Sequence, residues 1–326
     1  MSGIQDYNNG FEKKINRQLK EHPELIGFAN YIDGMNSITT KYNYIGYVIN
    51  FMKTTNKNIE DLTFDDYTRF LVTLNHTTPS YQRSVYFGLK RFSEYLAFSS
   101  KNSLNPMQNI RPPKNIESIE TKEKRAKGFL TKKEVVNTIK AVKKGAGNKR
   151  AIAIQRKWKE RDLAIIYIFL STGMRCSALY KLDLNNINWD ESSIVVIDKG
   201  SKIHKYILSD ETMKIIKDWI DKRIIILNND NSQEALFISS QKNRLGISSI
   251  SDIVQKYTVE IKGKHITPHK LRATFGTHLY NETRDIKFVQ DQMGHSNPQI
   301  TEIYIRGNQD ADRKKASDIM SKFLNS

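Results

Sequence analysis

The sequence predicts a multi-domain protein in which an all-α N-terminal domain precedes a mixed α+β domain with a small antiparallel sheet. Apolar residues recur at helical spacing in three segments between residues 40 and 100, and the pattern stops at the proline-containing stretch 105–114. Two β-rich runs, residues 194–197 and 205–208, lie among later helical segments. At 326 residues the chain is long enough for two domains that each bury a core.

Composition restricts the class of partner and the cellular compartment. A formal net charge of +17 indicates a polyanionic partner, most often nucleic acid. The single cysteine, Cys176, excludes an intramolecular disulfide and a cysteine-rich zinc module, which is typical of a reducing compartment. No long uncharged apolar run approaches membrane-spanning length, and the first residues lack the apolar region of a signal peptide. We therefore expect a cytoplasmic protein, associated with the nucleoid and without membrane contact.

The N-terminal part begins with residues 1–35, which are polar and which Pro23 and Gly34 interrupt. This stretch is expected to form an arm or one extra helix. The helical domain then covers residues 36–112, with helices starting behind Thr40, Thr63 and Thr78. Residues 113–128 have neither periodicity nor bulk, which predicts a linker.

The second domain is expected to span residues 129–326. Thr131 with Glu134 three residues later predicts a capping box. The basic stretch 143–161 is either an exposed loop and helix start or a contact to a DNA backbone, and residues 162–170 should form a buried helix. The β-rich runs flank a glycine-containing turn and predict a hairpin, and an amphipathic helix follows over 211–228.

A candidate site lies between residues 265 and 306. Thr267 and Pro268 are typical of an N-cap and first helical residue, so His269 and Arg272 share a face of the first turn. This face suits an anion, because helix N-termini present free N–H groups and partial positive charge. Leu271 and the residues four and eight positions later form an apolar stripe that would hold the helix against a core.

The motifs of this region resemble those of a known family. PHKLRATFGTHL followed by MGHSNPQITEIYI is similar to the boxes HxLRHxFATHL and LGHxxxxxTxxYxH of tyrosine recombinases, the phage-integrase family that includes Xer-type enzymes. TGMRCSAL resembles the family's TGxRxSEL box, and DKGSK resembles its GKGxK loop. The resemblance spans residues 40–326.

The resemblance implies a site that cleaves and rejoins DNA strands through a 3′-phosphotyrosyl intermediate, with neither ATP nor metal nor another cofactor. Its catalytic set would be Arg175, Lys199, His269, Arg272, His295 and the nucleophile Tyr304. One departure is Ala178, where the family usually has a carboxylate that orients the pocket. Either another acid such as Asp183 substitutes for it, or the site is held less rigidly.

The resemblance also implies partners. The helical domain would be a core-binding, SAM-like domain that clamps double-stranded DNA opposite the catalytic domain, with Arg83, Lys90, Arg91 and Lys202 as DNA contacts. The protein would be a monomer when free and a homotetramer on DNA. A C-terminal helix over residues 312–326 would either dock into a neighbouring protomer or pack on its own domain.

Three other interpretations fit parts of this sequence pattern. Chemistry of the type IB topoisomerase kind uses a similar set of residues in a monomer, and a non-catalytic DNA-binding regulator is supported only by Ala178. A zinc site is disfavoured, because Pro268 breaks the helix that His265 and His269 would need and no cysteine or acid cluster completes the ligand set.

Overall fold

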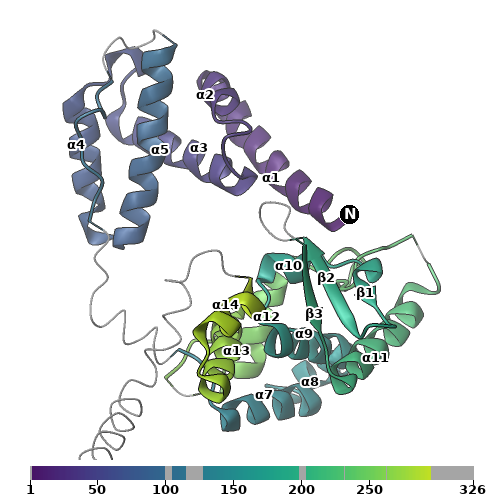
Figure 1. Ribbon diagram of the computed structural model, residues 1–326. Coiled ribbons are helices and arrows are strands. Elements are labelled where there is room, and N and C mark those ends of the chain that lie inside the picture. The colour runs from purple at the N-terminus through teal and green to yellow at the C-terminus, as the bar shows by residue number, and fades with distance from the viewer. Residues whose placement is uncertain are drawn as a thin grey trace, which may run out of the picture. The chain divides into compact units, whose positions relative to one another are not determined.

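The computed structural model describes residues 2–99, 105–114, 128–197, 203–230, 232–261 and 263–294 of the chain. It divides into two compact units, an N-terminal unit of residues 4–118 and a C-terminal unit of residues 1–3 with 119–326 (Figure 1). The linker predicted over 113–128 lies mostly outside the described residues. Among the helices that the structure describes, none is long and apolar enough to cross a membrane.

In the residues described, all regular secondary structure of the N-terminal unit is helical. Its elements are α1 (Ser2–Glu21), η1 (Pro23–Leu25), α2 (Ile26–Tyr31), α3 (Ile38–Thr55), η2 (Ile59–Asp61), α4 (Phe64–Thr73), η3 (Leu74–His76) and α5 (Pro79–Phe98). The predicted starts at Thr63 and Thr78 are confirmed, since both residues are N-caps. The predicted start at Thr40 is wrong by three residues. Ser37 caps α3 instead, and its hydroxyl accepts the Thr40 amide (3.3 Å).

Residues 1–35 contribute more than the predicted arm or single helix. They form α1 and α2, and Leu25, Phe28 and Ile32 are fully buried in the core of the unit. The Phe28 ring packs edge-on against Phe92 of α5, with ring centroids 5.2 Å apart. The first 35 residues are therefore part of this core.

The chain leaves the N-terminal unit along α5. The Tyr86 hydroxyl donates to the Ile110 carbonyl (2.6 Å), and the Arg83 guanidinium donates to the Pro113 carbonyl (2.7 Å). Met107, which lies between the end of α5 and Ile110 in the sequence, is fully buried. Residues 105–113 thus run back along the helix that precedes them.

The C-terminal unit combines helices with one small sheet. Its elements are α7 (Lys132–Lys144), α8 (Lys149–Arg156), α9 (Lys159–Thr172), α10 (Cys176–Tyr180), η4 (Leu184–Asn186), β1 (Ile187–Asn188), β2 (Ser193–Ile197), β3 (Ile203–Ile207), α11 (Asp210–Leu227), α12 (Ile247–Thr258), α13 (Pro268–Thr283) and α14 (Ile286–Met293). The sheet has the order β1-β2-β3 and is antiparallel throughout. The predicted fold class, all-α followed by α+β with a small antiparallel sheet, is confirmed.

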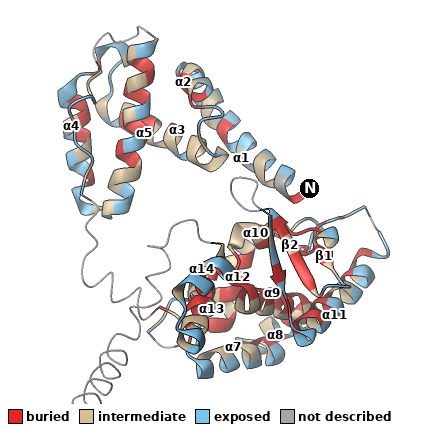
Figure 2. Ribbon diagram, in the orientation of Figure 1, coloured by how far each residue is buried: buried red, intermediate tan, exposed pale blue. Residues whose placement is uncertain are grey.

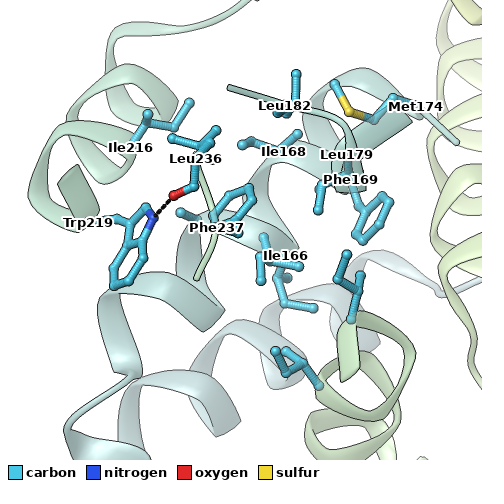
Figure 3. Packing of buried hydrophobic residues seen from close by; sticks show 14 of the residues in the cluster. Ile166, Ile168, Phe169, Met174, Leu179, Leu182, Ile216, Trp219, Leu236 and Phe237 are labelled. Carbon is cyan, nitrogen blue, oxygen red and sulfur yellow. Dashed lines mark hydrogen bonds between the residues drawn. The ribbon is translucent and has the colours of Figure 1, made fainter. Parts of the chain in front are cut away.

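The helix predicted over residues 162–170 is the centre of this unit. It is α9, which packs against α7, α11, α12 and α13, and Figure 2 shows that its residues are among the most buried. Figure 3 shows Ile166, Ile168 and Phe169 of α9 facing apolar side chains of neighbouring elements. Trp219 of α11 closes one side, and its indole N–H donates to the Leu236 carbonyl (2.9 Å).

The predicted hairpin is also confirmed. β2 and β3 pair with Ile197 opposite Ile203, so residues 198–202 connect the two strands. This connecting segment contains Lys199 and Lys202, and it lies outside the described residues. The predicted capping box is present as well, because the Thr131 hydroxyl accepts from the Glu134 amide while the Glu134 carboxylate accepts from the Thr131 amide.

Candidate active site

The turn after α9 fixes the position of Arg175. Gly173 has φ +60° and ends the helix, with its N–H donating to the Phe169 carbonyl (2.9 Å). Thr172 is buried, and its hydroxyl accepts the Met174 amide (3.1 Å). Arg175 follows as the N-cap of α10 and is partly buried. Hydrogen bonds of the Gly173 and Met174 amides therefore fix the conformation of the TGMR segment.

Gly173 is required for a second reason. A Cβ at this position would come within 2.4 Å of the Phe275 ring of α13. Glycine thus allows α13 to approach the end of α9 closely, in addition to allowing a positive φ.

Arg272 connects three segments that are far apart in the sequence. It projects from α13 and is only 3% exposed. One terminal nitrogen of its guanidinium donates to the Gly173 carbonyl, and the other donates to the Met293 carbonyl (2.7 Å). These acceptors lie two residues before Arg175 and two residues before His295. The Arg272 guanidinium therefore connects three segments: α13, the residues just before Arg175, and the end of α14.

His269 lies in the first turn of α13, three residues before Arg272, and is exposed. The helix begins at Pro268 behind Thr267, as predicted, although the Thr267 side chain makes no capping bond. Of the predicted stripe, Leu271 is fully buried in the main core. Phe275 and Leu279 instead pack on a small separate cluster with Val289 and Met293.

The element before His295 is α14. Asp285 caps it by accepting the Phe288 amide (2.9 Å), and Gly294, with φ +61°, ends it. His295 and Tyr304 lie outside the described residues, so the structure places the chain up to the residue before His295.

β3, the strand that follows the segment containing Lys199, makes a contact near the end of α14. His204 of β3 donates from Nε2 to the Gln292 carbonyl (3.2 Å), and its ring lies 4.3 Å from the Tyr206 ring. The hairpin whose connecting segment contains Lys199 is thereby attached beside the segment that precedes His295. Sequence reasoning missed His204, because the motif gives no role to a residue in the strand itself.

Asp183 supports α10 from its C-terminal side. The carboxylate is 1% exposed and accepts from Arg244 (2.6 Å), while Arg244 also donates to the Tyr180 and Leu182 carbonyls (3.1 Å each). Ala178 itself packs against the core. Arg244 therefore links the Asp183 carboxylate to the C-terminal end of α10, the helix that Arg175 caps at its N-terminus.

The proposed DNA contacts of the N-terminal unit have different surroundings. Arg83 is held by the Pro113 carbonyl and lies 5.4 Å from the Phe87 ring. Arg91 is exposed and pairs with Glu94 (2.9 Å), and Lys90 is partly buried. Arg83 thus has a structural contact that its sequence pattern did not predict.

A basic surface lies at the end of α7 and along α8. Its six cations are exposed, and no acidic residue occurs between positions 143 and 157: Lys143, Lys144, Lys149, Arg150, Arg156 and Lys157. The loop between the helices is fixed, because the buried Gln155 amide accepts from and donates to the backbone of Ala146 (2.9 and 2.7 Å). We call this set the α8 basic surface.

Comparison with known proteins agrees with this arrangement. The sequence model described as the phage integrase family matches residues 128–310, more than half of the chain, and the protein belongs to that family. The chain is 38% identical over 160 residues to tyrosine recombinase XerS of Streptococcus agalactiae serotype III, covering 48% of this chain and 45% of the relative. It is 30% identical over 218 residues to tyrosine recombinase XerC of Alcanivorax borkumensis, covering 66% and 65%. The chain thus aligns with less than half the length of the XerS relative.

Solved structures share the fold. The XerH recombinase bound to palindromic difH substrate gives a TM-score of 0.63 at 18% identity, covering 86% of this chain and 79% of that chain. A lambda integrase (75–356) dimer bound to a COC' core site gives 0.60 at 16% identity, covering 89% and 94%.

Proposed function

We propose that the protein is a site-specific DNA recombinase that breaks and rejoins DNA strands through a 3′-phosphotyrosyl intermediate. The observation that carries this proposal is the position of Arg272, whose guanidinium joins the segments next to Arg175 and His295. Relatives named tyrosine recombinase and membership of the phage integrase family support it.

The chemistry follows from the charge that develops when a tyrosyl oxygen attacks a phosphodiester. Two guanidinium groups, those of Arg175 and Arg272, would stabilise the non-bridging oxygens. His269 and His295 would bond the phosphate and help remove the Tyr304 proton, and Lys199 would protonate the departing 5′ oxygen. Because the phosphotyrosyl ester retains the bond energy, rejoining needs neither ATP nor metal.

The substrate in this proposal is duplex DNA bound by both units. The net charge of +17 and the α8 basic surface favour a polyanion. Similar folds occur in a lambda integrase tetramer bound to a Holliday junction, and we propose a homotetrameric synapse for this chain as well.

The experiment is covalent capture on a nicked duplex taken from the DNA that flanks the gene. Wild-type protein should become linked to the DNA, and Tyr304→Phe should bind equally well and form no link. Tyr167→Phe is the control, because it removes a phenol that bonds Glu211 on the surface (2.9 Å).

Other outcomes would assign other functions. Specific binding without any adduct in the wild type would indicate a non-catalytic regulator. Ala178, which replaces the usual carboxylate of the family, would then be a sign of lost catalysis. Relaxation of supercoiled DNA without recombination between two sites would indicate a topoisomerase of type IB.

A further inference from the structure

The chain that joins the two units enters the C-terminal unit along α13. We call residues 128–131 the linker strap. The Leu130 amide donates to the Thr274 hydroxyl (2.9 Å), and His278 Nε2 donates to the Leu130 carbonyl (2.8 Å). Both backbone groups of a fully buried residue are therefore bonded by side chains of the helix that carries His269 and Arg272.

Further contacts hold the strap on both sides of Leu130. Lys264 donates from Nζ to the Phe129 carbonyl (2.9 Å) and to the Glu134 carboxylate (2.7 Å). Gly128 is buried and lies directly against the Lys270 side chain. Burial disfavours ionisation of Glu134, but the Lys264 ammonium and the Thr131 donors outweigh it and lower the pKa of Glu134.

The strap lies on the side of α13 opposite Arg272. Lys270, Thr274 and His278 are four residues apart and share one face of the helix. At about 3.6 residues per turn, Arg272 projects roughly 160° away from Thr274. The helix is thus held between the strap on one side and the Gly173 and Met293 carbonyls on the other. A rotation of α13 about its axis would move the Arg272 guanidinium.

We propose that Thr274 and His278 are positioning residues that couple the linker strap to the orientation of α13, and through it to Arg272 and His269. This inference rests on the proposed function. Displacement of a reacting group by about 1 Å can cost roughly a hundredfold in rate, so loosening one side of the helix should slow strand cleavage. DNA affinity should change little, because Leu130, the strap residue that Thr274 and His278 bond, is buried inside the C-terminal unit.

The test compares three substitutions in the full-length protein. Thr274→Val keeps the shape of the side chain but removes the acceptor of the Leu130 amide, whereas Thr274→Ser retains the hydroxyl. Thr277→Val is the matched control, since Thr277 is similarly buried on the same helix and, among the described residues, makes no hydrogen bond to the strap. The measurements are the dissociation constant for duplex DNA and the single-turnover rate of adduct formation on a nicked duplex.

We expect Thr274→Val to bind DNA within about twofold of wild type and to form the adduct at least tenfold more slowly. Thr274→Ser should recover most of the rate, and Thr277→Val should react normally. Hydrogen exchange should also be faster at the Leu130 amide in Thr274→Val than in Thr277→Val.

Two results would overturn the inference. One is a Thr274→Val protein that reacts as fast as Thr277→Val although its Leu130 amide exchanges faster. The other is an equal loss of affinity and rate, which would indicate general destabilisation. If Thr274→Val fails to fold, Lys264→Gln loosens the strap from its more exposed side and must slow adduct formation without weakening binding. A wild type that binds DNA but forms no adduct would overturn the proposed function and this inference together.

Discussion

At the scale of single residues, Arg272 combines a structural role that the structure shows with a catalytic role that we propose. The motif resemblance predicts that it binds phosphate, and the structure shows that its guanidinium donates to two backbone carbonyls. A planar group with several N–H donors can do both, whereas a lysine ammonium is a point charge on a flexible chain. We therefore expect that a positive charge at position 272 supports normal cleavage only when it is carried by a planar guanidinium with several N–H donors.

Arg272→Lys should consequently bind target DNA normally and form the covalent adduct at least about a hundredfold more slowly, because the carbonyl bonds and the phosphate clamp are weakened together. The single-turnover rate of adduct formation measures this. Arg284→Lys is the control, since Arg284 is an exposed residue at the other end of α13. Near-normal cleavage by Arg272→Lys would show that the guanidinium geometry is unimportant.

A second residue-scale prediction concerns Asp66 in the capping box of α4. Burial opposes ionisation, but hydrogen bonds from the Lys57 ammonium and from Thr63 outweigh it and lower the pKa of Asp66 to about 2. A lowered pKa in the folded state means that its stabilisation is present above the unfolded value, 3.8, and is lost as the pH falls toward 2.

Asp66→Asn should therefore lower the free energy of unfolding by about 1 to 2 kcal/mol at pH 7, and by less as the pH falls below 4. Urea unfolding followed by circular dichroism at several pH values measures the difference. Asp65→Asn, on the exposed side of the same turn, is the control. An Asp66→Asn deficit that is the same at pH 7 and pH 3 would contradict the assignment.

At the scale of elements, local signals in the sequence predicted most boundaries correctly. Thr63, Thr78 and Thr131 are N-caps in the structure, and Gly173 and Gly294 end their helices with positive φ. These signals depend on residues within one turn of each other, so the sequence contains them. The start of α3 was misplaced because Ser37, an equally good cap, lies three residues before Thr40.

Contacts between distant segments were not predictable in the same way. Arg272 bonds Gly173, Leu130 bonds Thr274, and His204 bonds Gln292, and each pair is separated by many residues of sequence. The motif resemblance located the boxes that contain Gly173, Arg272 and Thr274, but it showed none of these bonds and gave no role to His204. The burial of Leu25, Phe28 and Ile32 was also missed, since their polar surroundings concealed a short apolar face.

The α8 basic surface allows an element-scale prediction. Each phosphate that a cation neutralises adds about 0.9 to the slope of log K against log salt. If three of its side chains contact DNA, Lys149→Gln, Arg150→Gln and Lys157→Gln combined should reduce the slope by up to about 2.7. Lys214→Gln with Lys217→Gln on α11 is the control, because the acidic residues Asp218 and Asp221 follow these lysines on the same helix. An unchanged slope would identify the α8 basic surface as a solvated face.

At the scale of the whole molecule, the proposed assembly involves a C-terminal segment that lies outside the described residues. The apolar stripe at positions 316, 319, 320, 323 and 324 predicts a C-terminal helix that needs a surface to bury against. Docking into a neighbouring protomer would couple the subunits of a tetramer, whereas packing on the same chain would not.

Changing both Phe323 and Leu324 to Ser should, if the helix is exchanged, leave single-site DNA binding intact and abolish cooperative binding to two sites. Band-shift titrations on one-site and two-site duplexes measure both quantities. Normal cooperativity, or loss of folding shown by thermal unfolding, would show that the helix is not a coupling element and that other contacts hold the assembly.

In the proposed mechanism one tyrosine attacks a phosphodiester and retains its 3′ phosphate, and identification of the linked atoms tests this mechanism most directly. Full-length protein is trapped on the nicked duplex, digested, and the DNA-bound peptide is sequenced by mass spectrometry. The expected result is a peptide linked through Tyr304 to a 3′ phosphate, with a free 5′ hydroxyl on the departing strand. Linkage through another residue, or to a 5′ phosphate, would contradict this mechanism.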